Sequence, residues 1–117
     1  MTLIDRLSKL DGPDPLVDVL IENELGLAQF KRFEIGYGDS VYERHNVQPL
    51  TASVDAAIAL AERLFPGTEY ELTNLYNIVR VTIEMNGEFG GFHGEHVNSL
   101  PIALCIALLR AKEASNA

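Results

Sequence analysis

The fold of this chain is decided by the run Ile102-Ala103-Leu104-Cys105-Ile106-Ala107-Leu108-Leu109. A helix is predicted there, beginning at Asn98 or Ser99, where a short polar side chain can accept from free backbone amides just before Pro101. Because this helix is apolar on nearly every side, it must be buried on more than one of them. The rest of the chain therefore has to supply its cover.

Three strands are predicted upstream of this helix. Residues 70–76 and 78–85 are rich in β-branched and aromatic residues, and apolar side chains alternate along one face of the second run. The pair Asn86-Gly87 indicates a turn, after which residues 88–97 form a third strand interrupted by glycine. These strands predict a small antiparallel sheet.

Another amphipathic helix precedes the strands. Thr51 or Ser53 can cap it, and Pro66-Gly67 ends it. Together, these elements predict an α+β fold in which an antiparallel β-sheet of about three strands packs with helices, in an α/β/α sandwich-like arrangement. Residues 1–117 are expected to form a single domain, of which 51–113 carry the helix, the strands and the last helix.

The first 50 residues divide into two parts. Residues 1–26 are predicted to form a helical hairpin, because Asp11-Gly12-Pro13 stops one apolar periodic run and Asp14-Pro15 caps the next. Residues 27–50 lose this periodicity and contain several turn residues, so we predict an irregular segment that is variable or faces a partner.

Composition and charge exclude some classes of partner. Of the 117 residues 47% are hydrophobic, and 17 acidic against 9 basic residues give a formal net charge of -8. A negative net charge opposes binding to a long nucleic acid, because its phosphate backbone is also negatively charged. We predict a solvated helical face for the densest acidic set, with an acidic surface for a basic partner as the alternative; the set is Asp5, Asp11, Asp14, Asp18, Glu22 and Glu24.

The location is predicted to be cytoplasmic, inside a bacterial host cell. The first residues lack the pattern of a secretory signal, and the longest apolar run is far shorter than the roughly 20 residues that cross a bilayer. No membrane contact is expected. Cys105 is the only cysteine, which excludes an internal disulfide, and its apolar neighbours predict a thiol packed as a small hydrophobic group.

Three segments together resemble one family. They are Leu3-Ile4-Asp5-Arg6-Leu7 with Asp11-Gly12-Pro13-Asp14, the segment Leu50-Thr51-Ala52-Ser53-Val54-Asp55-Ala56-Ala57, and Leu100-Pro101-Ile102-Ala103-Leu104-Cys105-Ile106-Ala107-Leu108-Leu109-Arg110-Ala111. In combination they look like the small phage and prophage proteins of the phage ABA-sandwich family. The resemblance implies an antiparallel sheet packed with helices and a phage or prophage origin. It brings no catalytic residues, and residues 27–48 fall outside it.

No catalytic or metal-binding set is predicted. The sequence lacks a nucleophile elbow and a phosphate-binding lysine motif, so we expect a protein that is not an enzyme and needs no cofactor. His93-Gly94-Glu95-His96 has a spacing found in some metal sites, but Gly94 argues against the helix that would aim both imidazoles at one ion. A structural or solvent-facing role is the better interpretation of these histidines.

Two segments contain candidate ligand-binding residues. One mixes aromatic and basic residues, and the other is a glycine-rich loop whose aromatic rings can stack on a planar ligand. The alternatives are an ordinary surface loop and a bulged strand whose rings fill the core. The candidates are Tyr37, Tyr42, Arg44, His45, Phe89, Phe92, His93 and His96.

These observations lead to one main hypothesis of function. The chain is expected to be a non-enzymatic phage accessory protein that antagonises host defence by sequestering a small nucleotide-like signal. The alternatives are an acidic inhibitor of a host nuclease or nucleic-acid-binding complex, and a phage structural or assembly component. A homo-oligomer is also expected, because a small protein often completes its ligand pocket across a symmetric interface.

Overall fold

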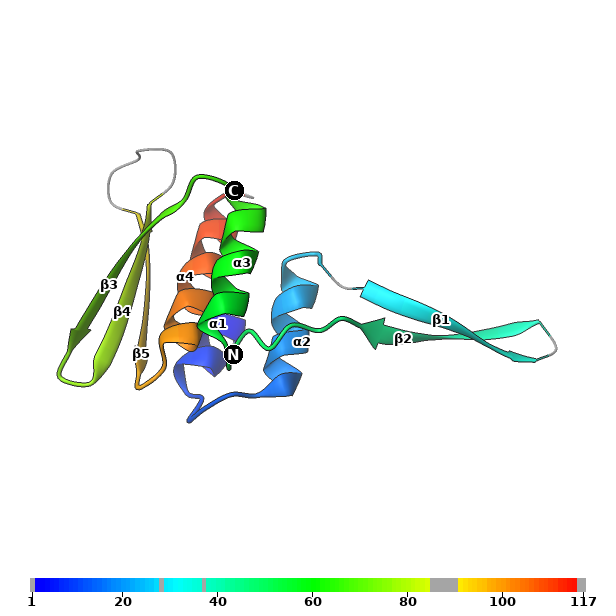
Figure 1. Cartoon of the computed structure of the whole chain (residues 1–117). Helices are drawn as coiled ribbons and strands as arrows, with labels where there is room; N and C mark the ends of the chain where they lie inside the picture. The colour runs from blue at the N-terminus through cyan, green and yellow to red at the C-terminus, as the bar shows by residue number, and fades with distance from the viewer. Residues whose placement is uncertain (1, 28, 37, 85–90, 116–117) are drawn as a thin grey trace.

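The computed structural model describes residues 2–27, 29–36, 38–84 and 91–115 (Figure 1). Its secondary structure is mixed, with helices at both ends of the chain and strands between them. The elements in chain order are α1 (Leu3–Ser8), α2 (Pro15–Glu24), β1 (Gln29–Gly36), β2 (Asp39–His45), α3 (Val54–Leu64), β3 (Glu69–Leu75), β4 (Ile78–Glu84), β5 (Phe92–Val97) and α4 (Leu100–Ser115).

The main sheet is antiparallel and has the order β3-β4-β5. Tyr76 and Asn77 both adopt positive φ in the turn between β3 and β4, as a tight hairpin requires. The predicted class, an α+β fold with a three-stranded antiparallel sheet packed with helices, is confirmed. The helices lie on one side of this sheet (Figure 1), so among the described residues its other face stays open where an α/β/α sandwich would cover it.

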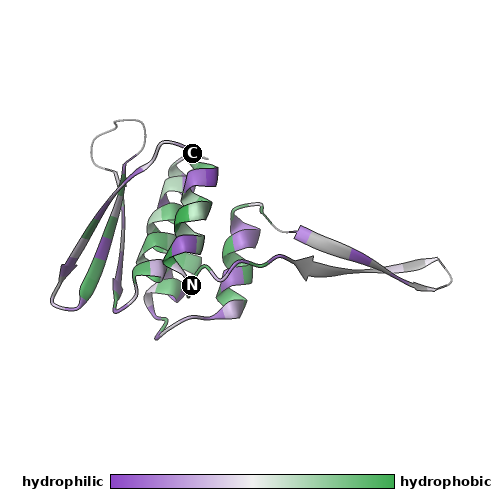
Figure 2. Cartoon of the chain, in the orientation of Figure 1, coloured by the Kyte–Doolittle hydropathy of each residue, from purple (hydrophilic) through white to green (hydrophobic). Residues whose placement is uncertain are grey.

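Helix α4 forms the centre of the core, as its sequence predicts. Every residue from Ile102 to Leu109 is buried, and the helix packs against β4, β5, α3 and α1. Ser99 caps it, since its Oγ accepts from the Ile102 amide at 3.3 Å. Figure 2 shows the same distribution of hydropathy, with mainly hydrophobic residues along the buried part of α4.

Gly94 marks the closest approach of the sheet to α4. A Cβ atom at this position would lie 1.9 Å from the Ala103 carbonyl oxygen and 2.6 Å from the Ala107 amide nitrogen. Only glycine permits this separation. The glycine that interrupts the predicted third strand is therefore the residue that lets α4 pack against it. The described part of that strand covers residues 92–97, whereas the predicted turn at Asn86-Gly87 lies outside the described residues.

The N-terminal helices are both capped by side chains, and α2 begins at the predicted Asp14-Pro15. Thr2 caps α1 in a reciprocal capping box with Asp5, and the Asp14 carboxylate accepts from the Leu16 amide at 2.9 Å. Helix α3 is capped by Ser53, one of the two predicted candidates. Among the described helices, none is long and apolar enough to cross a membrane.

Residues 27–50 differ most from the prediction. Most of this segment forms the antiparallel hairpin of β1 and β2, with a turn in which Gly36 and Gly38 adopt positive φ. The prediction of an irregular segment is therefore wrong. Apolar residues alternate with polar ones only briefly there, at Phe33 and Ile35, whereas a longer alternation is the signal by which a half-buried strand is identified.

We call residues 29–45 the arm and the remaining described residues the body. The arm extends away from the helices, and the protein measures 58 × 31 × 26 Å along its principal axes (Figure 1). Within the described part of the chain, β1 and β2 contact each other extensively and no other helix or strand to a comparable degree. The arm is thus an unsupported two-stranded ribbon joined to the body at its root.

Candidate functional site at the root of the arm

Two buried carboxylates on α2 hold the chain where it returns from the arm. The Asp18 Oδ1 atom accepts from the Thr51 amide at 2.8 Å and from the Thr51 hydroxyl at 2.7 Å. One turn further along, Glu22 Oε2 accepts from the Gln48 amide at 3.2 Å. Hydrogen bonds of this kind offset much of the cost of burying a carboxylate. They fix residues 48–51, and hence the root of the arm, against α2.

These contacts correct the prediction for the acidic set. Asp18 and Glu22 are only 4% and 6% exposed, so they do not belong to a solvated face. Asp5, Asp11 and Glu24 are exposed as predicted. The difference arises because Asp18 and Glu22 are four residues apart beside the buried stripe of α2, where they meet the returning chain.

A pocket of about 210 Å³ opens beside the second of these carboxylates, Glu22, between α2, α3 and the root of the arm. Leu27, Leu50 and Leu60 supply apolar surface. Its polar lining comes from four elements or connections that are far apart in the sequence, namely Glu22, Gln29, Asn46, Gln48 and Arg63. We call this feature the root pocket.

The polar groups of the root pocket are partly organised by one another. Asn46 Nδ2 donates to Gln29 Oε1 at 3.3 Å, and Gln48 Nε2 donates to the Asn46 carbonyl at 3.2 Å. Arg63 is exposed in the last turn of α3. The pocket therefore combines amide donors and acceptors, a buried carboxylate and a guanidinium around an apolar surface, as sites for small polar ligands often do.

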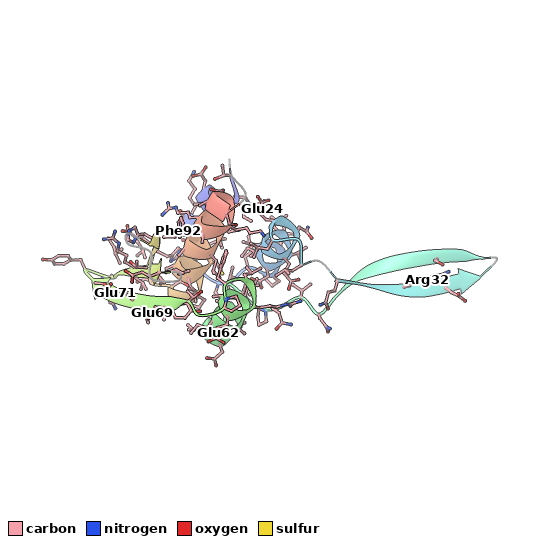
Figure 3. The ribbon with its side chains drawn as sticks, turned by 90° about the horizontal axis from the view of Figure 1, so that it is seen from above. Glu24, Arg32, Glu62, Glu69, Glu71 and Phe92 are labelled. Carbon is pink, nitrogen blue, oxygen red and sulfur yellow. The ribbon has the colours of Figure 1, made fainter. Side chains whose placement is uncertain are left out.

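The sequence-predicted ligand residues are not brought together. The arm and β5 lie on opposite sides of the helices, and Figure 3 shows Arg32 of the arm far from Phe92 of β5. Tyr42, Arg44 and His45 belong to β2, where they pair with residues 32, 30 and 29 of β1. Tyr37 and Phe89 lie outside the described residues.

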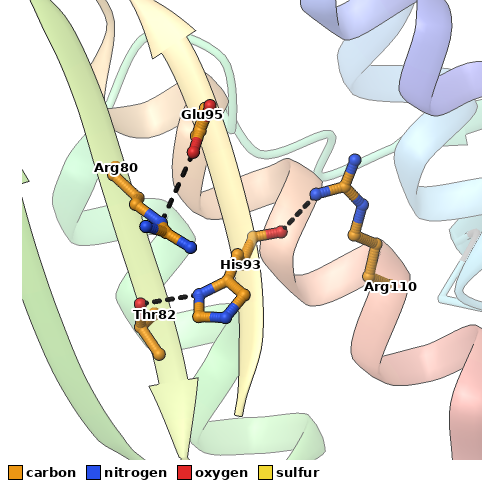
Figure 4. Close-up of polar contacts among 5 residues, drawn as sticks. All are labelled: Arg80, Thr82, His93, Glu95 and Arg110. Carbon is orange, nitrogen blue, oxygen red and sulfur yellow. Dashed lines mark hydrogen bonds and ion pairs between the residues drawn. The ribbon is translucent and has the colours of Figure 1, made fainter. Parts of the chain in front are cut away.

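The two histidines of β5 point to opposite faces of the sheet, because they lie three positions apart and side chains alternate along a strand. His93 Nδ1 lies 2.9 Å from the Thr82 hydroxyl, and the His93 carbonyl accepts from Arg110 at 2.7 Å (Figure 4). One ion cannot be held by both side chains. Within the described residues, no group of three or more suitable side chains gathers for a metal.

His96 is a structural residue and not the ligand-binding residue that was predicted. It is only 6% exposed, and its Nε2 lies 2.6 Å from the Leu10 carbonyl, to which it donates. This bond connects β5 with the chain that follows α1. Phe92 is half-buried and pairs with Ile83 in the β4–β5 ladder, which agrees with the core-filling alternative.

Cys105 is not a nucleophile in this fold. Its thiol is buried, and burial, with a smaller contribution from the charge of Asp18, raises the pKa of Cys105 to about 12. A thiol of this kind is almost fully protonated near neutral pH and has little reactivity. The prediction that it packs as a small hydrophobic group is confirmed.

Comparison of the chain with protein-family models, with curated proteins and with solved structures found no match. The resemblance to the phage ABA-sandwich family therefore stays a prediction.

Sequence reasoning missed the residues of the root pocket. Glu22 was assigned to a solvated face, and Gln29, Gln48 and Arg63 carry no motif. One signal was present: Asp18 and Glu22 flank the apolar positions Val17 and Ile21, so a helix that buries those positions draws both carboxylates toward the interface. Their partners on the returning chain, however, depend on the tertiary fold.

Proposed function

We propose that this protein binds a small nucleotide-like ligand in the root pocket and sequesters it without transforming it. The observation that carries this proposal is the combination of a buried carboxylate, side-chain amides and apolar surface in one hollow. In keeping with the phage resemblance of its sequence, the proposed role is to withhold a signalling nucleotide of a bacterial host.

The chemistry of the pocket suits the parts of such a ligand. Asn and Gln side chains can pair with the donor and acceptor edge of a base, and a carboxylate can accept from an exocyclic amino group. A volume of about 210 Å³ suits a base more than a whole nucleotide. The phosphate would then lie toward Arg63, whose guanidinium can grip it through two hydrogen bonds.

Titration calorimetry with a panel of cyclic and linear nucleotides tests the proposal. We expect heat from at least one ligand and an affinity lower by about 10-fold or more in Arg63→Ala, since a charged hydrogen bond contributes about 1.5–3 kcal/mol. Arg80→Ala is the matched control, because Arg80 is exposed on the open face of the main sheet and pairs with Glu95. The absence of heat with every nucleotide, from folded protein, would refute the proposal.

The distribution of charge favours a second candidate function. The arm contains three basic and three acidic residues, so the whole net charge of -8 belongs to the rest of the chain. An acidic body of this kind suits the basic surface of a nuclease or nucleic-acid-binding complex, to which it would be steered electrostatically. The test is nuclease activity in a bacterial lysate. Inhibition at low salt that disappears at high salt supports this candidate, and unchanged activity at low salt rejects it.

A further inference from the structure

The arm leaves the outer edge of β1 without a partner in the described structure. β1 pairs with β2 along one edge only, and the two-stranded sheet contains no third strand. The backbone amides and carbonyls of such an edge are a template for another strand. A two-stranded hairpin is also marginally stable by itself in water, so additional pairing would stabilise the arm.

The sequence of β1 is self-complementary. Around Phe33, the charges are arranged so that Arg32 precedes it and Glu34 follows it. When two copies of such a strand pair antiparallel about Phe33, Arg32 of each copy comes to lie directly opposite Glu34 of the other. Opposite residues share a face in an antiparallel ladder, so both pairs can form.

The side chains of Arg32 and Glu34 are accessible for this pairing. Their side chains are 57% and 80% exposed, and the two form an ion pair within the strand at 3.7 Å. Arg32 Nε also donates to the Ser40 hydroxyl at 2.9 Å, which holds the guanidinium along the arm. In the paired arrangement, the charges of two copies form one alternating cluster of four.

The remaining charges of the arm point to the same arrangement. The half nearest the body contains Lys31, Arg44 and Glu43, with a net charge of +1, whereas Asp39 lies beside the turn at the tip. Antiparallel arms place the acidic tip of one copy over the basic root half of the other. They also place the two acidic bodies at opposite ends, which limits the repulsion between them.

We propose that two copies of this chain associate through their arms, with β1 of one copy antiparallel to β1 of the other and a two-fold axis at Phe33. The result is a four-stranded sheet with the order β2-β1-β1-β2. The interface is isologous, because the same residues contribute from both copies. At its centre the two Phe33 residues are opposite each other, which is a favourable cross-strand pair.

Sedimentation velocity of single and mixed charge variants tests the register. The wild-type chain is expected at twice its 12.9 kDa mass. Glu34→Lys and Arg32→Glu each place like charges opposite each other in a homodimer. Each variant alone should therefore be mainly monomeric, with a dimer dissociation constant at least about 10-fold higher than that of the wild type. An equimolar mixture should dimerise again, because both cross-strand pairs are then of opposite charge.

Controls separate this effect from a general change of charge. Arg6→Glu and Glu71→Lys change exposed residues of the body and should leave the dimer intact. The double variant Arg32→Glu with Glu34→Lys exchanges the two charges within one chain and should also dimerise. A wild-type chain that stays monomeric at about 0.1 mM, above the dissociation constants of most specific complexes, would overturn the proposal. So would a mixture that remains monomeric.

Cross-linking provides an independent readout. In the proposed register, Phe33→Cys brings two thiols together at the two-fold axis, whereas Ser40→Cys on β2 does not. Under a mild oxidant, only Phe33→Cys should give a disulfide-linked dimer on a non-reducing gel, because Cys105 is buried. Equal cross-linking of both variants would contradict the register. None of these measurements needs a ligand, so their outcome is independent of nucleotide binding at the root pocket.

Discussion

Replacing Gly94 with alanine should destabilise the protein strongly, because the backbone of α4 leaves no room for the added methyl group. The new Cβ would lie 1.9 Å from the Ala103 carbonyl oxygen and 2.6 Å from the Ala107 amide nitrogen, and both atoms belong to the backbone of α4. No side chain can move aside to accept it. The helix and β5 would therefore have to separate by about 1 Å or more, a gap that forfeits a quarter to a half of the dispersion energy of their contacts.

The expected loss is at least about 3 kcal/mol, the upper end of the usual cost of overpacking a core. This is a large part of the total of about 5–15 kcal/mol that stabilises a typical domain. Urea unfolding followed by circular dichroism measures it, with variant and wild type at the same protein concentration. Gly12→Ala is the control, because a Cβ there meets nothing within 4 Å and should change stability by less than about 1 kcal/mol. A similarly small loss in Gly94→Ala would refute the reasoning.

Three further variants test other parts of the body by urea unfolding. Thr51→Val removes the hydroxyl that donates to the buried Asp18 carboxylate and accepts from the Asp14 amide, and should cost about 2 kcal/mol; an unchanged midpoint would mean that these bonds contribute no stability. Tyr70→Phe removes a buried hydroxyl that has no hydrogen-bond partner among the described residues, so stability should stay equal or rise by about 1 kcal/mol, and a clear loss would reveal a missing partner. Burial raises the pKa of Cys105 from 9.0 to about 12, so the unfolded state loses this proton first as the pH rises. Stability should therefore fall above pH 9 by up to about 1.4 kcal/mol per pH unit, and Cys105→Ala should reduce this slope; equal slopes would contradict the assignment.

The elements of the body were predictable because their signals are local. Asp14 and Ser53 begin helices with side-chain acceptors, and the apolar run of α4 required burial on several sides wherever it packed. The alternation of apolar and polar residues in β4 is also a local signal. It predicts that Val81 and Ile83, two positions apart, face the same side of the sheet, and both are buried. Each of these features depends on neighbours within about one turn or one strand.

The arm and the root pocket could not be predicted in this way. The strands of the arm show too little alternation of apolar and polar residues to be identified, and only turn residues were recognised in this segment. The carboxylate of Asp18 is buried because Thr51, 33 residues later, returns to it. Partners at such separations are decided by how the body folds as a whole, and a sequence read by local pattern leaves them open.

The hydrogen bond from His96 to Leu10 joins residues 86 positions apart, and α4, which follows His96 directly, also covers the buried Leu7 of α1. A ribosome adds roughly 5–20 residues per second, so the partners of α1 in β5 and α4 are synthesised on the order of ten seconds after α1 itself. A nascent chain of this protein therefore exposes these first apolar residues until α4 has been synthesised. Closure of the core around α1 follows the emergence of α4 from the exit tunnel.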